Sequence, residues 1–340
     1  MSLTQPKVVL VAGATGKQGR ATIAALLNLG QNAQQFRILA LTRNASSSAA
    51  KKLSTDFPER LTVVEGDLST KESLTAVFER SRAEGSSIWG VFAVMTYPGL
   101  GVDSAGEEMQ GKNLAEVAHE NKVGCFVYTS LERAGEMFDE EAPPGSTHAA
   151  KVKIERRIKE LGLPWTILRP TRFMENFQGQ MGGLGWSIFS VGLKPTTTLH
   201  LIAADDIGHV AAGVFQSPDM FKSQVLVLRG DNLTCPEQYN IYRKAAGRNI
   251  SSIPNFVARG ILRMNAHLQE MIELFEKTSA AVAEGKVPEF EGQLELARKA
   301  AALGGGKLTT FEEWANASGH RENEEGWNKI SLLSLFTGRH

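Results

Sequence analysis

Short apolar runs alternate with amphipathic stretches along the first half of the chain. Continuous apolar runs are typical of strands buried on both faces of a parallel sheet, and apolar residues at helical spacing indicate helices with one buried face. Strands are predicted at 7–13, 36–43, 61–68, 88–96, 124–130 and 164–170, and helices at 18–30, 71–85, 106–122 and 148–162. In the first helix, Ile23, Leu26 and Leu27 form the apolar face and Gly30 marks the end.

This alternation predicts βαβ units with right-handed crossovers and therefore an α/β protein, a Rossmann-type doubly wound parallel sheet. We expect residues 1–170 to form the Rossmann domain. Residues 171–340 are expected to form a smaller, mainly helical C-terminal domain, some of whose strands return to the main sheet.

The pattern changes after residue 173. The segment 178–194 is rich in glycine and aperiodic, which predicts loops that close over a ligand or a flexible surface excursion. Within it, the stretch 179–192 carries Trp186 and Phe189, which suit either a substrate lid or a partner surface.

Further along, Asp206 is expected to begin a helix, and 223–247 indicates a strand, a turn and a capped helix. Thr234 and Glu237 have the spacing of a capping box in that helix. Residues 256–303 are strongly helical. Their predicted buried stripe consists of Leu262, Met264, Leu268 and Met271.

Composition narrows the function classes. The chain has 340 residues, 42% of them hydrophobic, with 37 Lys+Arg balanced by 37 Asp+Glu, so no net field favours nucleic acid or an anionic membrane. The first residues, MSLTQPK, lack the basic-then-apolar pattern expected of a signal peptide, and no run approaches the ~18 apolar residues that span a bilayer. Cys125 and Cys235 have no metal-type or disulfide spacing and are expected to be packing residues. We expect no metal, no direct nucleic-acid or membrane partner, and a cytoplasmic location.

The strongest local motif joins the first strand to the first helix. It places Gly13, Gly16 and Gly19 in the sequence GATGKQG, directly after an apolar run. Gly13 permits the tight turn, Gly16 lets the backbone approach a pyrophosphate, and Gly19 lets the helix pack on the strand. The helix N-terminus offers N–H groups and partial positive charge to phosphates. The context predicts a dinucleotide site.

The end of the second strand discriminates between cofactors. An NAD site normally has an acidic residue there, whereas this chain has Arg43 and no acid until Asp56. A guanidinium suits the 2′-phosphate of NADP(H), and Lys17 could add a second cation. The competing interpretation makes Arg43 a solvated loop residue. After the third strand, Asp67 could accept from the adenine amino group or cap the helix beginning near residue 69.

Taken together, the stretches GATGKQG, ALTRN, VEGDL, GKNLAEVAHENKVGCFVYTS, LGLPWTILRPTRFMENF, DIGHVAAGVF and TTFEEWA resemble the NmrA-like family. These proteins are atypical members of the short-chain dehydrogenase/reductase superfamily, and the resemblance covers residues 7 to about 318. It implies NADP(H) bound in the crevice of a Rossmann domain. Some members are reductases of quinones, aromatic compounds and fungal metabolites, and others report redox state to transcription factors or enzymes.

Carried over by position, the resemblance implies a set of cofactor contacts spread over six segments, with 173–176 at the nicotinamide end. The contacts are Gly13, Ala14, Thr15, Gly16, Lys17, Gln18, Arg43, Asp67, Leu68, Met95, Thr96, Tyr97, Lys151, Phe173, Met174, Glu175 and Asn176.

Catalysis is harder to assign, because reductases of the superfamily commonly use Tyr-x-x-x-Lys on one helix face and this chain has Thr147 in the tyrosine position. Lys151 is present, and it could bind ribose, protonate substrate, or simply pair with Glu155 at i,i+4. Other candidate proton donors or orienting hydroxyls are Tyr97, Ser130 with its neighbour Thr129, and His148, which is more typical of a surface residue at a helix start. Tyr128 is expected in the core.

Two functions follow. One is an NADPH-dependent reductase of a small, fairly apolar carbonyl, quinone or enone-type substrate. The other is a non-catalytic NADP(H) sensor that acts on a protein partner, a transcription factor or an enzyme, and such a regulator could also enter the nucleus. The oligomeric state stays open, with a homodimer as one alternative.

Overall fold

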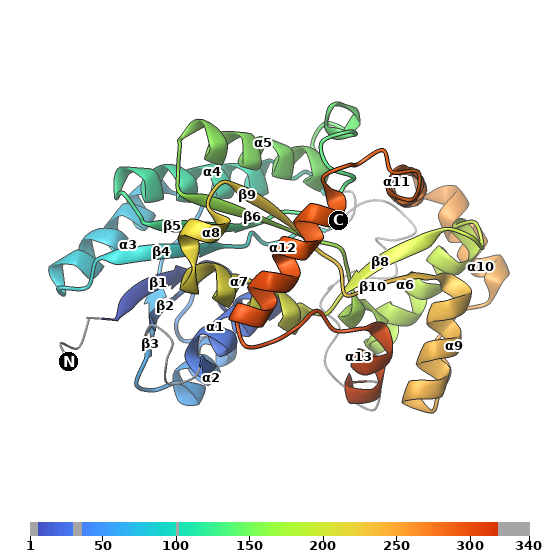
Figure 1. Ribbon diagram of the computed structural model, residues 1–340, viewed down its shortest axis with the longest axis horizontal. Coiled ribbons are helices and arrows are strands. Elements are labelled where there is room, and N and C mark those ends of the chain that lie inside the picture. Colours follow the sequence, from blue (N-terminus) through green and yellow to red (C-terminus); the bar gives the residue numbers. More distant parts are fainter. Residues whose placement is uncertain (1–5, 30–35, 100–101, 319–340) are drawn as a thin grey trace.

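The computed structural model describes residues 6–29, 36–99 and 102–318. Figure 1 shows a large parallel sheet with helices on both faces, and a smaller, mainly helical part beside it that surrounds a short second sheet. The predicted Rossmann-type α/β fold is therefore confirmed.

The main sheet has seven parallel strands in the order β3-β2-β1-β4-β5-β6-β9. The strand order reverses between β1 and β4, which is where doubly wound proteins bind their ligands, outside the carboxyl ends of the strands. The strands are β1 (Lys7–Val11), β2 (Phe36–Thr42), β3 (Leu61–Glu65), β4 (Ile88–Ala93), β5 (Cys125–Thr129), β6 (Trp165–Pro170) and β9 (Gln224–Leu228).

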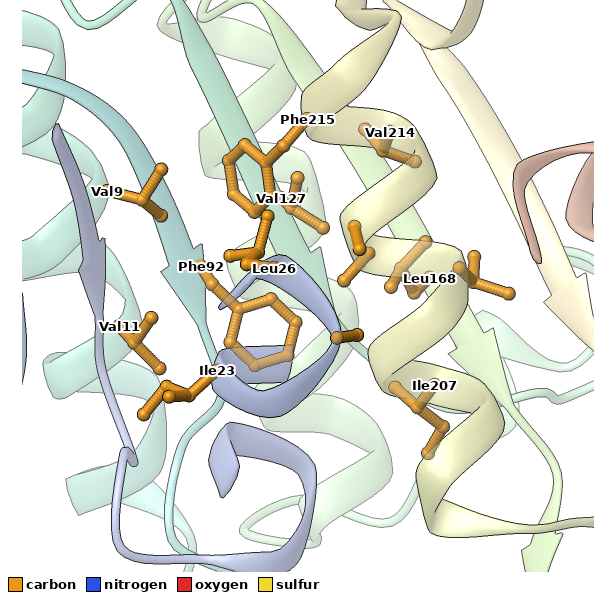
Figure 2. Packing of buried hydrophobic residues seen from close by; sticks show 14 of the residues in the cluster. Val9, Val11, Ile23, Leu26, Phe92, Val127, Leu168, Ile207, Val214 and Phe215 are labelled. Carbon is orange, nitrogen blue, oxygen red and sulfur yellow. The ribbon is translucent and has the colours of Figure 1, made fainter. Parts of the chain in front are cut away.

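Alternate residues of each strand serve two separate cores, because successive side chains point to opposite faces of a sheet. Val9 and Val11 face a layer made by α1 (Lys17–Asn28), α7 (Ala204–Gln216) and α12 (Phe290–Leu303). Figure 2 shows Ile23 of α1 and Ile207 of α7 packed in this layer. The intervening strand residues contact α3 (Lys71–Ala83), α4 (Ala105–Glu120) and α5 (Thr147–Glu160) on the other face.

The smaller part is built on the three-stranded sheet β10-β8-β7. Its strands are β7 (Arg172–Phe173), β8 (Thr198–Ile202) and β10 (Asp231–Thr234), and its helices are α6 (Gly179–Gly192), α9 (Cys235–Ala246), α10 (Asn255–Met264), α11 (Ala266–Ala283) and α13 (Phe311–Ser318). Because β9, α7 and α12 join the main sheet, the chain after residue 171 contributes to both parts. The division at residue 170 stays a prediction.

The glycine-rich segment is a helix, so the expectation of loops at 178–194 was wrong. In α6, Trp186 and Phe189 are buried in the core of the smaller part, and neither offers the exposed surface that a lid or partner site needs. The glycines allow close packing: a Cβ on Gly183 would lie 2.7 Å from the Cβ of Ser251. Tertiary burial therefore outweighs the low helix propensity of glycine.

Several local predictions are corrected at their boundaries. Of the predicted buried stripe, Leu268 is buried as expected, whereas Met264 is 71% exposed, so its prediction was wrong. Helix α7 begins at Ala204, two residues before Asp206. Helix α2 (Ser48–Asp56) was not predicted, because its polar sequence buries only Ala50 and Leu53. Gly30 lies outside the described residues.

Other details agree with the sequence. Thr234 and Glu237 form the predicted capping box of α9, and Cys125 and Cys235 are both buried. Three short elements complete the description: the 3₁₀ turns η1 (Asp139–Glu141) and η2 (Met174–Phe177), and the helix α8 (Pro218–Phe221), which precedes β9. None of the described helices is long and apolar enough to cross a membrane.

Candidate functional site

The glycine loop makes the turn that a dinucleotide site requires. Gly13 has φ +70°, and a Cβ there would lie 2.7 Å from both the side chain and the carbonyl oxygen of Val94. A Cβ on Gly19 would lie 2.2 Å from the carbonyl oxygen of Gly13. Larger residues at either position would therefore push β1, β4 and α1 apart, and the loop passes directly over the carboxyl ends of these strands.

Helix α1 begins at Lys17 with Gly16 as its N-cap, and no side chain caps this end. Its first N–H groups and its dipole therefore face the loop, in the arrangement that binds phosphates. The buried Oε1 of Gln18 has no hydrogen-bond partner among the described residues. Lys17 acts electrostatically on Glu175, so the structure brings the glycine loop and the 173–176 segment together.

Arg43 follows the last residue of β2 and is exposed, which leaves its guanidinium accessible at this edge of the sheet. Asp67 follows β3 and lies in a local turn: its Oδ1 accepts from the backbone N–H of Ser69 at 2.9 Å. The N-cap of α3 is Thr70, so Asp67 is not the cap residue itself. The neighbouring Leu68 is half-buried, and its carbonyl accepts from Asn113 at 3.1 Å.

Residues 95–97 follow β4, which ends at Ala93, earlier than predicted. Met95 is buried, whereas Thr96 and Tyr97 are exposed, Tyr97 by 45%. Partial burial, together with the carboxylate of Glu107, raises the pKa of Tyr97 to about 12. The phenol is therefore protonated at neutral pH and is suited to donating a hydrogen bond.

Lys151 is not paired with Glu155. Its Nζ lies 2.8 Å from Oε1 of Glu107 on α4, and the side chains are only 12% and 1% exposed respectively. The same ammonium lies 5.8 Å from the ring centroid of Tyr128, which is fully buried as predicted. Burial, with a contribution from Glu107, holds the pKa of Tyr128 well above its usual value. Glu107 thus pairs with Lys151, and its charge acts on the phenols of Tyr97 and Tyr128; we refer to these four residues as the Lys151 cluster.

Thr147 occupies the position of the missing tyrosine, and its hydroxyl lies 3.0 Å from that of Ser104. At the end of β5, Thr129 and Ser130 are buried, and their hydroxyl oxygens have no hydrogen-bond partner in the described part of the chain. His148 is buried rather than exposed, with Nε2 3.7 Å from Oδ1 of Asp139.

The segment 173–176 lies between the two parts of the molecule. Phe173 packs against the core of the main sheet, Met174 belongs to the core of the smaller part, and Asn176 is exposed. Oε1 of Glu175 accepts from the backbone N–H of Ala204 at 3.0 Å and from Nε1 of Trp314 at 3.3 Å. Burial raises the pKa of Glu175.

Sequence reasoning missed a buried charge network behind the Lys151 helix. Glu155 accepts from Arg133 at 2.8 and 3.0 Å and from Arg169 at 3.3 and 2.7 Å. Burial alone would raise the pKa of Glu155, but the two guanidinium groups hold it far below its usual value. Arg133 also donates to Asp139, at 2.6 Å. This network ties the loop after β5 to both α5 and β6.

Sequence reasoning also missed Glu107, although the spacing of apolar residues along α4 indicated that this position faces the core. Glu107 shares a helix face with Gly111 and Leu114, all three buried, so a carboxylate stands at a core-facing position of α4. Such a residue needs a buried cation, and the sequence does not show which lysine supplies it.

The fold and the glycine loop define the class of the protein, a Rossmann-type α/β protein with the geometry of a dinucleotide site. Residues 5–315 match the NmrA-like family. The chain belongs to the NmrA-like family, which confirms the predicted resemblance.

Individual relatives agree with this assignment. An NmrA-like family domain-containing oxidoreductase of Penicillium ochrochloron is 26% identical over 262 residues, 71% of this chain and 74% of the relative. The structure of NmrA, a negative transcriptional regulator, in complex with NADP aligns over 92% of this chain and 95% of NmrA, with TM-score 0.61 and 18% identity. The NADPH-dependent quinone oxidoreductase QOR2 of Escherichia coli, complexed with NADPH, aligns over 91% of this chain and 99% of QOR2, with TM-score 0.62 and 18% identity. At these identities the two structures show a shared fold.

Proposed function

We propose that this protein binds NADP(H) and is an NADPH-dependent oxidoreductase that reduces a small, fairly apolar carbonyl, quinone or enone-type substrate. The tight turn at Gly13, the uncapped start of α1 and the unpartnered Oε1 of Gln18 support a dinucleotide on the loop. The exposed Arg43 at the end of β2 supports a 2′-phosphate there. The oxidoreductase and NADP(H) complexes among its relatives point the same way.

The observation that carries the catalytic part is the cluster of Lys151, Glu107 and Tyr97. When bound, NADPH supplies a hydride to the substrate carbon, and the carbonyl oxygen must gain a proton. Thr147 cannot supply it, because an aliphatic hydroxyl has no accessible pKa. We assign that role to the Tyr97 phenol, which, unlike the buried phenol of Tyr128, is exposed after the carboxyl end of β4.

Lys151 has a different role in this scheme. Its ammonium, held by the buried carboxylate of Glu107, would orient the ribose and stabilise the developing oxyanion. Ser130, with its unpartnered hydroxyl, is the candidate for orienting the substrate. We assign Asp67 and Leu68 to the adenine side of the crevice, Met95 and Thr96 to the cofactor contacts at the end of the fourth strand, and 173–176 to the nicotinamide end.

The test of turnover is NADPH oxidation across a panel of quinones, aldehydes and enones. Tyr97→Phe should lower kcat by about 10²-fold or more, in the range that general acids contribute. Lys151→Met should lower kcat and raise the Kd for NADPH. Lys153→Met is the matched control, because Lys153 lies on the same helix and pairs with Glu108 from a 53% exposed position. Equal loss in Lys153→Met and Lys151→Met would contradict the assignment.

The cofactor choice has its own test. Arg43→Ala should weaken NADPH binding much more than NADH binding in a titration, because only NADPH carries the 2′-phosphate. Equal losses for the two cofactors would refute the role of Arg43.

The second candidate is an NADP(H) sensor that acts on a transcription factor or an enzyme. The Thr147–Ser104 contact favours it, since the usual catalytic tyrosine position is occupied by a hydroxyl that bonds within the protein. Tight NADP(H) binding, no turnover with any substrate class, and unequal affinities for NADP⁺ and NADPH would decide for the sensor.

If the protein is a reductase, we propose a cytoplasmic location. If it is a sensor, we propose that it is present in both the cytoplasm and the nucleus. The described cysteines, Cys125 and Cys235, are free, in keeping with a reducing compartment. A homodimer remains the alternative to a monomer, and sedimentation of the purified chain distinguishes the two.

A further inference from the structure

Arg172 is a buried cation without a counter-charge among the described residues. It lies in β7, directly before the 173–176 segment, and it is 9% exposed. Its Nη1 has no hydrogen-bond partner in that part of the chain. Two other arginines of the described chain are more deeply buried, Arg133 at 1% and Arg169 at 2% exposed, and both of them donate to the carboxylate of Glu155.

The surroundings of Arg172 are aromatic. The carbon of its guanidinium lies 4.7 Å from the ring centroid of Phe177 and 4.5 Å from that of Phe189. Phenyl rings attract a cation through their faces, but they offer no lone pairs on which the N–H groups can end their hydrogen bonds. The rings therefore compensate the charge in part and leave the Nη1 donor unsatisfied.

The titratable side chain that acts electrostatically on Arg172 does not provide an anion. Cys235, the first residue of α9, is buried, and burial raises the pKa of its thiol to about 11, so it is neutral at physiological pH. Burial lowers the pKa of Arg172 to about 10, which leaves it charged at neutral pH. A lone buried charge costs free energy unless a partner arrives from outside.

We propose that Arg172 is the anchor of a binding site for an aromatic carboxylate. A guanidinium presents two parallel N–H donors that match a carboxylate, and the rings of Phe177 and Phe189 suit an aromatic body attached to it. Trp186, whose ring centroid is 6.0 Å from that of Phe177, extends the aromatic wall. The test of this site is ligand binding, which does not depend on whether the protein turns over NADPH.

The test is calorimetric titration of the full chain, without cofactor, with benzoate, with uncharged benzamide and with acetate at constant ionic strength. Benzoate should bind with one site per chain. Benzamide should bind at least about tenfold more weakly, because it lacks the charge. Acetate should also bind more weakly, because it lacks the ring.

Two variants and one control assign the site. Arg172→Met should lose benzoate binding by at least about tenfold while its unfolding temperature without ligand stays equal or rises, because an unpaired buried charge is replaced by an apolar chain. Arg172→Lys keeps the charge without the fork and should bind benzoate at an intermediate affinity. Arg229→Met is the matched control: Arg229 also lies over a phenyl ring, that of Phe290 at 4.9 Å, but it has a carboxylate partner in Glu291 at 3.2 Å.

The proposal is overturned if wild-type protein gives no saturable heat with millimolar benzoate, or if benzamide binds as well as benzoate. It is also overturned if Arg172→Met binds benzoate like the wild type. A lower unfolding temperature in Arg172→Met with unchanged benzoate binding would make Arg172 a packing residue only.

Discussion

Replacing Glu155 by Gln should be among the most damaging single-atom changes in this protein. The side chain is 1% exposed, and its two oxygens accept four hydrogen bonds, at 2.7 to 3.3 Å, from Arg133 and Arg169. The variant keeps the volume, so no cavity is made. It removes the charge and turns N–H donors of the new amide toward guanidinium groups that are themselves only donors.

The magnitude follows from what is left behind. Breaking a buried ion pair by removing one partner costs about 3–5 kcal/mol, since the remaining charge is uncompensated. Here two arginines lose their shared carboxylate, although Arg133 keeps Asp139 as a partner. We therefore expect the free energy of unfolding to fall by about 3–5 kcal/mol in the Glu155→Gln variant.

Urea unfolding, followed by circular dichroism, measures this change as a lower midpoint at unchanged m value. Glu160→Gln is the control on the same helix: its carboxylate pairs with Arg157 at 3.5 Å from a 63% exposed position, and such a pair contributes about 0–1 kcal/mol. A loss below about 1 kcal/mol for Glu155→Gln, no larger than that of the control, would refute the reasoning.

The pH dependence supplies a second check on Glu155. A carboxylate whose folded pKa lies below its unfolded value stabilises the protein above the unfolded value, about 4.3, and loses that contribution as the pH falls. The difference in stability between wild type and Glu155→Gln should therefore be largest near neutral pH and shrink on acidification. A difference that is constant with pH would show that the charge is not the cause.

Three further outcomes are expected. Gly185→Ala should raise the free energy of unfolding by about 0.5–1 kcal/mol, because Gly185 lies inside α6 and a Cβ added there would meet no other atom within 4 Å; a loss on urea unfolding would contradict this. Leu268→Ala should cost about 2–5 kcal/mol in the same assay, and Met264→Ala little, since only Leu268 is buried. Burial raises the pKa of Asp206 to about 6, so its contribution to the stability of the wild type should fall by about 3 kcal/mol as the pH rises from ~4 to above 6. The stability of the wild type should therefore fall by that amount relative to Asp206→Asn over this range, and parallel pH profiles of the two proteins would refute the prediction.

Much of the fold was predictable because its signals are local. A strand buried on both faces needs a continuous apolar run, and the runs preceding Gly13, Arg43 and Ser130 have that pattern whatever surrounds them. The capping box at Thr234 and Glu237 likewise depends on residues only three positions apart.

The candidate site was predictable in part, for the same reason. The turn at Gly13 follows from a glycine between a strand and a helix, and Arg43 follows from the end of the next strand. The partner of Lys151 was not predictable, because Glu155 and Glu107 both suit a lysine by charge, and only the packing of α4 on α5 chooses Glu107. Glu155 accepts hydrogen bonds from Arg133 and Arg169, which the loop after β5 and the strand β6 bring together, and it is therefore not the partner of Lys151.

The doubly wound sheet, the glycine loop and the family could all be inferred from the amino-acid sequence, since they depend on periodicity and short spacing. Only the tertiary structure shows that the glycine-rich segment forms the helix α6. The burial of Trp186 and Phe189 and the close packing of the glycines outweigh the low helix propensity of this segment. The tertiary structure also decided which charges meet in the core. Arg172 shows this most clearly: nothing local distinguishes it from Arg169, but of the two only Arg169 has a carboxylate of the described chain within reach, because ion pairing in a core depends on contacts between distant segments.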